Sequence, residues 1–265
     1  MKYTLGIIGV GVMGQAIMSR VIDNRVVEAS KISVFDIDQE KVKQIPYNIN
    51  MLNSVQELAD NSEFILIAVK PQHYAAIFEK VVFNQNNIIL SIMAGVKIST
   101  LKQKVNADCK IVRIMPNTPC RIGKGVSALC FEGVPEDKKS FVISMFDACG
   151  ATVVVKEETF DAVTSVSGSG PAYVYMFADA MIKGGMAGGL SYEDSKQLAI
   201  NTISGTAELA LQSKEELSVL TDRVCSKGGT TIEAVEVFRK RDLEGIIIEG
   251  MTACREKSKI LSETL

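Results

Sequence analysis

The sequence contains a single histidine, His73, and none of its six cysteines stands in a Cys-x-x-Cys pair. A Cys/His zinc set cannot be assembled from these residues, so we expect no metal site. A chain of 265 residues buries a core large enough to fold without disulfides. We therefore expect the thiols to be reduced and mostly buried in a cytoplasmic protein.

Long apolar runs and an excess of positive charge are also missing. No uninterrupted run approaches the roughly 18 residues of a membrane-spanning helix. Glycines break the apolar stretch after Met1-Lys2, so we expect no signal peptide. Lys+Arg number 29 against 31 Asp+Glu, which gives a formal net charge of −2. No summed positive field attracts phosphate, and we expect neither nucleic acid nor a membrane as partner.

The first part of the chain alternates short apolar runs with helical stretches. The runs are apolar on consecutive positions, as in strands of a sheet that is covered on both faces. This alternation predicts βαβ units and an α/β fold with a mostly parallel, doubly wound sheet. The expected strands are Leu5–Ile8, Ile32–Phe35, Phe64–Val69, Ile88–Ile92, Ile111–Ile114, Val126–Phe131 and Thr152–Val155. The expected helices are Met13–Ile22, Gln39–Gln44, Ser54–Ala59, His73–Val81, Ile98–Val105 and Asp137–Cys149.

The pattern changes near residue 156, after which only helical stretches are expected. We therefore predict an α/β domain over residues 1–156 and an all-α domain over 157–265. Gly184-Gly185 is expected to stop a helix, because glycine pairs are poor in a helix interior. The expected helices are Pro171–Ile182, Tyr192–Gln212, Leu217–Cys225, Thr230–Arg239 and Leu243–Leu261.

Two of these helices are apolar on more than one face, at Tyr173–Phe177 and Ile246–Ile248. Such helices either occupy the centre of their own bundle or bury a face against a second copy of the chain. The second interpretation is favoured, because a helical domain of about a hundred residues has few layers in which to hide them.

A glycine motif that fits G-x-G-x-x-G follows the first strand and opens a helix: Gly9-Val10-Gly11-Val12-Met13-Gly14. In this context it predicts a dinucleotide site, with the pyrophosphate at the helix N-terminus. The alternative is a purely structural glycine turn. Asp36 ends the second strand, where a carboxylate accepts hydrogen bonds from ribose hydroxyls and favours NAD. The alternative for Asp36 is a turn acid or helix N-cap, a role that Asp38 is able to fill.

Lys70 ends a further strand, in Ala68-Val69-Lys70-Pro71, and is expected at the edge of the cofactor cleft. Three more segments carry a family resemblance: Ile114–Pro119 (IMPNTP), Val163–Val174 and Asp222–Ala234. Together with the glycine motif they resemble pyrroline-5-carboxylate reductases, the last enzymes of proline biosynthesis. The likeness extends from residue 6 to about residue 260.

The resemblance implies a Rossmann domain followed by a helical dimerisation domain, in a homodimer and in assemblies such as a decamer of five dimers. It implies hydride transfer from NADPH or NADH to C5 of 1-pyrroline-5-carboxylate, which gives L-proline. It places at the cofactor Gly9, Val10, Gly11, Val12, Met13, Gly14, Asp36, Ala68, Val69, Lys70, Pro71, Met93, Ala94, Asn117 and Thr118. It places at the substrate Ser226, Gly228, Gly229, Thr230 and Thr231, with Ser226 and Thr231 as the catalytic residues.

These substrate residues suit the chemistry of a ring with a carboxylate and a C=N bond. Free N–H groups at a helix start attract the carboxylate. Thr231 is the candidate to hydrogen-bond the ring nitrogen. The alternative for this segment is a Ser N-cap followed by a glycine turn. Cys225, which directly precedes it, is either a reactive thiol or a packing residue, and packing is favoured because reduction of an imine needs no nucleophile.

The chain departs from the family pattern at Lys227, which stands where proline is usual, and at Cys120-Arg121, which replaces small apolar residues. Two rival functions stay open. One is a related imine or β-hydroxyacid reductase, although neither Lys183 nor Lys196 carries the motif of the latter. The other is a non-catalytic paralogue that keeps dinucleotide binding and dimerisation.

Overall fold

The computed structural model describes residues 1–79, 81–105 and 109–264. By its internal contacts the chain forms two compact units. The sheet unit comprises Met1–Ser169 together with the end of the chain from Cys254, and the helical unit comprises Gly170–Ala253. The predicted boundary at residue 156 divides the chain differently, because the segment from 157 to 169 packs with the sheet.

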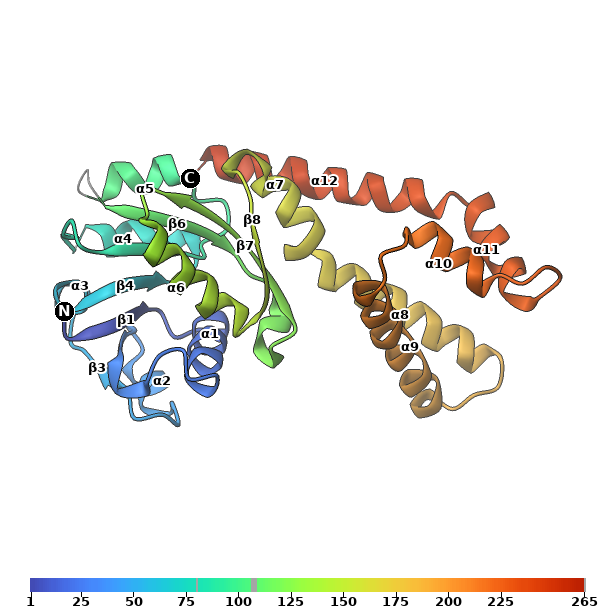
Figure 1. The fold of residues 1–265 in the computed structure, drawn as a ribbon, viewed down its shortest axis with the longest axis horizontal. Coiled ribbons are helices and arrows are strands. Elements are labelled where there is room, and N and C mark those ends of the chain that lie inside the picture. The colour runs from blue at the N-terminus through green and yellow to red at the C-terminus, as the bar shows by residue number, and fades with distance from the viewer. Residues whose placement is uncertain (80, 106–108, 265) are drawn as a thin grey trace. The chain divides into compact units, whose positions relative to one another are not determined.

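The sheet unit is built on a twisted sheet whose eight strands, within the described residues, lie in the order β3-β2-β1-β4-β5-β6-β7-β8 (Figure 1). All neighbouring pairs are parallel except β6 and β7. The strands are β1 (Tyr3–Ile8), β2 (Ile32–Phe35), β3 (Asn50–Met51), β4 (Ser62–Ile67), β5 (Ile88–Ser91), β6 (Lys110–Met115), β7 (Gly125–Glu132) and β8 (Gly150–Val154). The predicted mostly parallel α/β sheet is confirmed, and β3, too short to give an apolar pattern, was missed.

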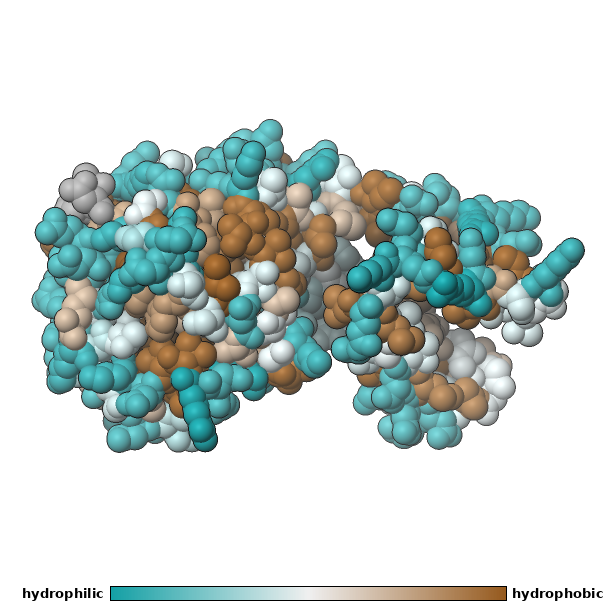
Figure 2. All heavy atoms as spheres, viewed as in Figure 1, coloured by the Kyte–Doolittle hydropathy of each residue, from teal (hydrophilic) through white to brown (hydrophobic). Residues whose placement is uncertain are grey.

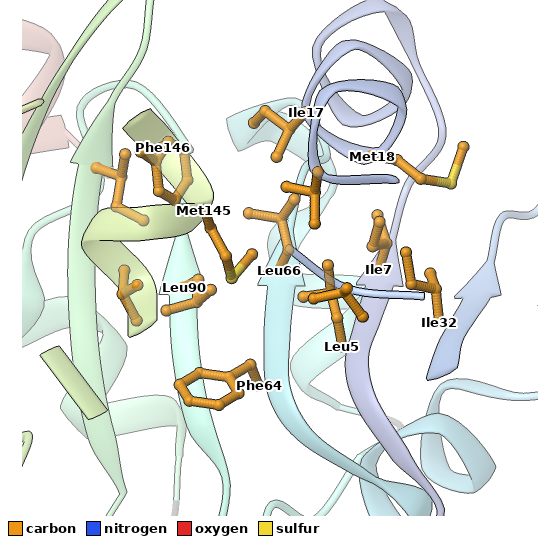
Figure 3. Packing of buried hydrophobic residues seen from close by; sticks show 14 of the residues in the cluster. Leu5, Ile7, Ile17, Met18, Ile32, Phe64, Leu66, Leu90, Met145 and Phe146 are labelled. Carbon is orange, nitrogen blue, oxygen red and sulfur yellow. The ribbon is translucent and has the colours of Figure 1, made fainter. Parts of the chain in front are cut away.

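Helices cover both faces of this sheet, which explains why its strands are apolar at consecutive positions. In β4, Phe64 and Leu66 face one core, and Ile65 and Ile67 face the other. Figure 3 shows the first core, where α1 and α6 pack over Phe64 and Leu66. The α-helices that lie wholly within this unit are α1 (Val12–Asp23), α2 (Gln39–Lys43), α3 (Val55–Asn61), α4 (Tyr74–Phe78), α5 (Ile98–Lys104), α6 (Glu136–Asp147) and α7 (Phe160–Val163).

The helical unit contains α8 (Gly170–Ala187), α9 (Tyr192–Gln212), α10 (Leu217–Val224), α11 (Thr230–Lys240) and the first part of α12 (Leu243–Thr264). The predicted all-helical organisation of this part is confirmed. The predicted helix stop at Gly184-Gly185 is wrong. A Cβ at Gly185 would lie 2.7 Å from Ser195 Oγ of α9. Gly185 therefore permits close packing of the two helices. The helix α8 ends later, at Ala187, and Gly189, whose φ is +95°, lies in the turn that follows.

The Ser- and Gly-rich segment that precedes α8 is helical. After α7 the chain forms a π-helical turn over Thr164–Gly168, closed by Ser169 N–H donating to the Thr164 carbonyl at 2.9 Å. We call Thr164–Gly168 the π-turn. It belongs to the sheet unit, and the chain enters the helical unit directly after Ser169.

Large apolar side chains of the helical unit are exposed, among them Val174–Phe177 on α8 and Ile246–Ile248 on α12. Figure 2 shows hydrophobic residues, coloured brown, on the surface of this unit. Within one chain, these residues are therefore not buried at the centre of their own helical bundle. None of the helices in the described ranges has the length and apolar character needed to cross a bilayer. Of the cysteines, Cys109, Cys120 and Cys149 are buried, whereas Cys130, Cys225 and Cys254 are partly exposed.

Candidate active site

The carboxyl ends of four neighbouring parallel strands, β1, β4, β5 and β6, meet at one edge of the sheet. The residues that follow these strands are Gly9, Ala68, Ile92 and Pro116. Backbone hydrogen bonds extend beyond the strands, from Ala68 N–H to Ile8 O at 2.8 Å and from Ile92 N–H to Ile67 O at 3.3 Å. The sequence segments expected at the dinucleotide therefore converge on one edge, the usual ligand edge of a parallel sheet.

The three glycines of the motif meet three different needs. Gly9 has φ +94°, a conformation that disfavours any side chain. A Cβ at Gly14 would lie 2.3 Å from the Gly9 carbonyl oxygen, so Gly14 permits close packing of helix on strand. A Cβ at Gly11 would meet no atom within 4 Å. The protein itself does not require a glycine at position 11 for space, and the open volume there suits an approaching ligand.

The N-terminus of α1 is free to bind an anion. Gly11 is its N-cap, no side chain caps the helix, and no acidic residue lies in its first turn. Val12 is exposed and Met13 half-buried, and both contribute N–H groups to this turn. Uncapped N–H groups and the positive end of the helix dipole together favour phosphate. The N-terminus of α1 therefore fits a dinucleotide pyrophosphate.

Asp36, just after β2, is bound to the glycine loop. Its Oδ2 accepts the Val10 N–H at 2.8 Å, and its Oδ1 accepts the Asp38 N–H at 2.9 Å. Asp38 is the N-cap of α2 and pairs with Lys41 at 3.1 Å, which lowers the pKa of the Asp38 carboxyl. The sequence left open whether Asp36 caps a helix or lies at the glycine loop. In the structure Asp38 caps α2, and Asp36 contacts the glycine loop.

The other residues expected at the cofactor lie along the same edge. Val69 is half-buried and its Cγ1 would lie 2.8 Å from a Cβ at Gly9. Lys70 is exposed and caps a short 3₁₀ turn that Pro71 begins. Met93 is buried, whereas Ala94 is exposed beyond β5.

Asn117, after β6, is buried and its amide binds protein at both ends. Its Oδ1 accepts the Val126 N–H at 3.0 Å, and its Nδ2 donates to the Ser167 carbonyl at 3.2 Å. Thr118 is exposed and begins a 3₁₀ helix, Thr118–Ile122. No sequence pattern indicated the Asn117–Ser167 contact, although the segment that contains Ser167 is unusually rich in Ser and Gly.

A buried thiol pair lies close behind this segment. The thiol of Cys149 hydrogen-bonds Cys120, which lowers the pKa of Cys120, and the same contact with burial raises the pKa of Cys149. Neither sulfur is exposed to reagents.

A separate pocket of about 440 Å³, lined by Lys31, Glu63 and Lys138 among others, lies at the amino ends of the strands, away from the cofactor edge.

The residues expected at the substrate lie in the helical unit, between α10 and α11. Gly229 N–H donates to the Ser226 carbonyl at 2.9 Å, which closes a four-residue turn. Gly228 has φ +73°, whereas Lys227 keeps a negative φ. This is the pattern of a type II turn. A Cβ at Gly229 would lie 2.3 Å from Ser226 Oγ, so the serine hydroxyl folds over Gly229.

The turn delivers the chain to the start of α11. Gly229 is its N-cap, and no side chain caps the helix. Thr230 is exposed and Thr231 half-buried at the first turn. Like α1, α11 therefore presents free N–H groups with a favourable dipole to an anion. The alternative of a Ser226 side-chain cap is wrong.

Comparison with known proteins agrees with this two-part arrangement. Residues 157–261 match the family described as pyrroline-5-carboxylate reductase dimerisation. Residues 4–95 match the family described as NADP oxidoreductase, coenzyme F420-dependent.

Whole-chain relatives extend the match. The pyrroline-5-carboxylate reductase of Escherichia coli is 35% identical over 270 residues, covering 100% of both chains. That of Aquifex aeolicus is 37% identical over 214 residues, 80% of both chains. Among solved structures, pyrroline carboxylate reductase of Plasmodium falciparum with NADP bound is 30% identical, with a TM-score of 0.88 over 99% of both chains. The Coxiella burnetii enzyme is 26% identical with a TM-score of 0.91, covering 98% of this chain and 99% of that one. The chain belongs to the pyrroline-5-carboxylate reductase family.

Proposed function

We propose that this protein reduces 1-pyrroline-5-carboxylate to L-proline with NADPH or NADH. One observation carries the proposal: the expected sites for both anionic ligands stand at helix N-termini that no side chain caps, α1 for the dinucleotide and α11 for the substrate carboxylate. The family relationship supplies the reaction, and these two helix starts supply the places where this chain's residues take part.

The dinucleotide supplies the hydride when bound. Gly11 leaves room for its pyrophosphate, and the N–H groups of Val12, Met13 and Gly14 face the phosphates. Asp36 is proposed to accept hydrogen bonds from the ribose hydroxyls, through the lone pairs that its two backbone contacts leave free. The remaining residues proposed to line the cofactor are Gly9, Val10, Ala68, Val69, Lys70, Pro71, Met93, Ala94 and Thr118. Asn117 lies at the same edge, with both atoms of its amide bonded to the protein.

At the substrate, the turn that ends in Gly228 and Gly229 and the N–H groups of Thr230 and Thr231 are proposed to bind the carboxylate. Ser226 and Lys227 stand in the same turn and add a hydroxyl and a cation. Thr231 is proposed to hydrogen-bond the ring nitrogen. When C5 receives the hydride, the C=N double bond becomes a single bond and the nitrogen keeps its proton, which the Thr231 hydroxyl helps to hold.

This reaction does not need a histidine–carboxylate pair. A protonated imine is already electrophilic, so positioning at the nicotinamide supplies much of the rate enhancement. Reduction of a ketone to a hydroxyacid is different, because its oxygen needs a proton donor. The single, exposed His73 near the sheet edge is consistent with the imine reaction.

We further propose that the protein is a cytoplasmic homodimer that assembles as a decamer of five dimers and binds neither nucleic acid nor membranes. The matched dimerisation family and the exposed apolar faces of α8 and α12 support burial against a second copy. Sedimentation analysis of the purified protein tests both the dimer and the decamer.

Oxidation of NADPH and of NADH, followed by absorbance with and without 1-pyrroline-5-carboxylate, tests the reaction. Substrate-dependent oxidation with stoichiometric proline is expected. Folded, dimeric protein that binds the dinucleotide and oxidises neither cofactor would instead identify the non-catalytic paralogue. Activity on another cyclic imine alone would identify the related imine reductase.

A further inference from the structure

The chain leaves the sheet unit and returns to it at two adjacent points. It leaves after Ser169 and returns at Cys254. Ser169 Oγ and Cys254 Sγ lie 3.2 Å apart, and Ser258 Oγ donates to Asp161 Oδ1 at 2.7 Å. The segment that ends at Ser169 and the segment that begins at Cys254 are thus bonded to each other within the sheet unit. The π-turn directly precedes Ser169.

Two contacts fix the π-turn to the carboxyl end of β6. Asn117 Nδ2 donates to the Ser167 carbonyl at 3.2 Å. A Cβ at Gly168 would lie 2.6 Å from Met115 Cε, so Met115 packs directly on this glycine. A π-turn leaves its backbone less regularly bonded than an α-helix, and such turns are frequent at functional sites. An external donor to the Ser167 carbonyl therefore stabilises a conformation that the segment holds poorly by itself.

The same amide also reaches the sheet. Asn117 Oδ1 accepts the Val126 N–H at 3.0 Å, where β7 begins, and Asn117 is 9% exposed. One side chain thus connects the end of β6 and the start of β7 with the segment that leads to α8. Because the amide has a protein partner on both atoms, we propose that Asn117 is a positioning residue that clamps the π-turn to the cofactor edge, rather than a ligand of the nicotinamide amide.

This inference rests on the proposed function in one respect. The π-turn is bonded to the edge of the sheet where the dinucleotide is proposed to bind, so its order affects turnover only if that edge takes part in the proposed hydride transfer. A loosened π-turn is expected to lower kcat, which depends on the alignment of hydride donor and acceptor. Binding of the dinucleotide, which uses the sheet unit, is expected to stay unchanged.

Two substitutions separate the two ends of the clamp. Asn117→Asp keeps an oxygen for the Val126 N–H but places a second oxygen against the Ser167 carbonyl. Asn117→Ala removes both contacts. Ser167→Ala is the matched control, because the serine hydroxyl bonds Val163 O while its main-chain carbonyl stays available to Asn117.

Backbone hydrogen exchange is the direct measurement. In Asn117→Asp, amides 164–169 are expected to exchange at least tenfold faster, with the Val126 amide unchanged. In Asn117→Ala both regions are expected to exchange faster, and in Ser167→Ala the Val126 amide and the clamp are retained. Unchanged exchange of 164–169 in both Asn117 variants would overturn the clamp. Thermal unfolding verifies that each variant is folded. If Asn117→Ala does not fold, Asn117→Asp alone tests the clamp.

Ligand binding distinguishes the clamp from a nicotinamide contact. The probes are NADP⁺ and 2′-phospho-ADP-ribose, which lacks the nicotinamide. The clamp predicts Kd values within about twofold of the parent for both probes and a kcat about tenfold lower at unchanged KM for NADPH. Selective weakening of NADP⁺, with 2′-phospho-ADP-ribose unaffected, would overturn it. A parent protein that is inactive refutes the proposed function alone, because exchange and binding are read without turnover.

Discussion

Asp36 Oδ2 accepts the backbone N–H of Val10 at 2.8 Å, so the acid at the end of β2 is attached to the loop that is proposed to hold the pyrophosphate. One carboxylate thereby binds the loop, and in the proposed function its remaining lone pairs bind the ribose hydroxyls. In that proposal, cofactor choice and the order of the loop depend on the same side chain. A substitution at this position therefore changes both, in proportions that differ between NADH and NADPH.

Asp36→Asn is expected to lower kcat/KM for NADH about tenfold, a loss of roughly 1.4 kcal/mol. The loss for NADPH is expected to be smaller, because the substitution also removes a charge that repels the 2′-phosphate. The NADPH-to-NADH ratio of kcat/KM measures the effect. Asp38→Asn, which changes the N-cap of α2, is the control and should leave the ratio within about twofold. Equal losses with both cofactors would reduce Asp36 to a loop anchor.

Gly11 and Gly14 are expected to separate binding from stability. Gly11→Ala places a methyl group in open space, so Tm should stay within about 3 °C while KM for NADPH rises at least tenfold. Gly14→Ala places it 2.3 Å from a backbone oxygen that has little freedom to move. Overpacking of this kind costs about 1–3 kcal/mol. Comparable thermal destabilisation of the two variants would contradict the assignment of the open space to a ligand.

The strands other than β3 were predictable from their apolar runs, most of them buried on both faces, and their observed ends differ from the predicted ones by no more than two residues. The Ser/Gly-rich segment after α7 was not, because its hydroxyls bond the helix's own carbonyls. Thr164 Oγ1 donates to Phe160 O at 2.9 Å and Ser167 Oγ to Val163 O at 3.1 Å. Composition alone does not reveal whether such residues cap, break or continue a helix.

The candidate site divides in the same way. The glycine motif was predictable because its spacing encodes a turn and a close approach. The partners of Asn117 were not, because the Ser167 carbonyl lies 50 residues away and every residue carries such an acceptor. Gly185 misled the prediction for a related reason, since its neighbour Ser195 belongs to another helix. The local sequence pattern predicts helices and strands, but it does not indicate contacts between residues that are far apart in the chain.

Thr231→Val is expected to lower kcat/KM for 1-pyrroline-5-carboxylate by about 10²-fold, the lower range for loss of a group that assists proton placement. Valine keeps the branched shape and removes only the hydroxyl. Thr230→Val is the matched control at the neighbouring, exposed position, and a loss below about fivefold is expected there. A larger loss at Thr230 than at Thr231 would assign the ring nitrogen to the other hydroxyl.

Lys227→Pro is expected to stabilise the turn that precedes α11. Position 227 is the second residue of a type II turn, which favours proline, and Gly228 supplies the positive φ that follows it. Proline at a compatible position adds about 0.4–1 kcal/mol by restricting the unfolded chain. The substrate KM should change more than the cofactor KM. Lys227→Met removes the charge without introducing a proline ring. If Lys227→Met and Lys227→Pro change the substrate KM equally, the effect is due to the lost cation. If Lys227→Pro changes the substrate KM and the cofactor KM equally, the loop does not lie at the substrate.

The ion pair between Arg113 and Glu157 is expected to hold the end of the sheet unit together. The Arg113 guanidinium is buried, lies 4.4 Å from the centre of the Phe160 ring, and donates to Glu157 Oε1 at 2.9 Å. The same oxygen accepts the Ile98 N–H, which begins α5, at 2.7 Å. Glu157→Gln leaves a buried cation without its counter-charge. Because the Glu157 side chain is 31% exposed, solvent screens part of the effect, and we expect about 2 kcal/mol rather than the full loss for a buried pair.

That loss corresponds to a fall in Tm of about 4–8 °C for a chain of this size. Glu158→Gln changes the same charge one residue later, without a contact to Arg113 among the described residues, and should shift Tm by less than 2 °C. Thermal unfolding of the two variants at low and at moderate salt measures the difference. A buried pair is screened less than an exposed one, so the gap between the variants should persist in salt. A gap that closes as the salt concentration rises would show that Glu157 acts through long-range charge and not through its contacts with Arg113 and Ile98.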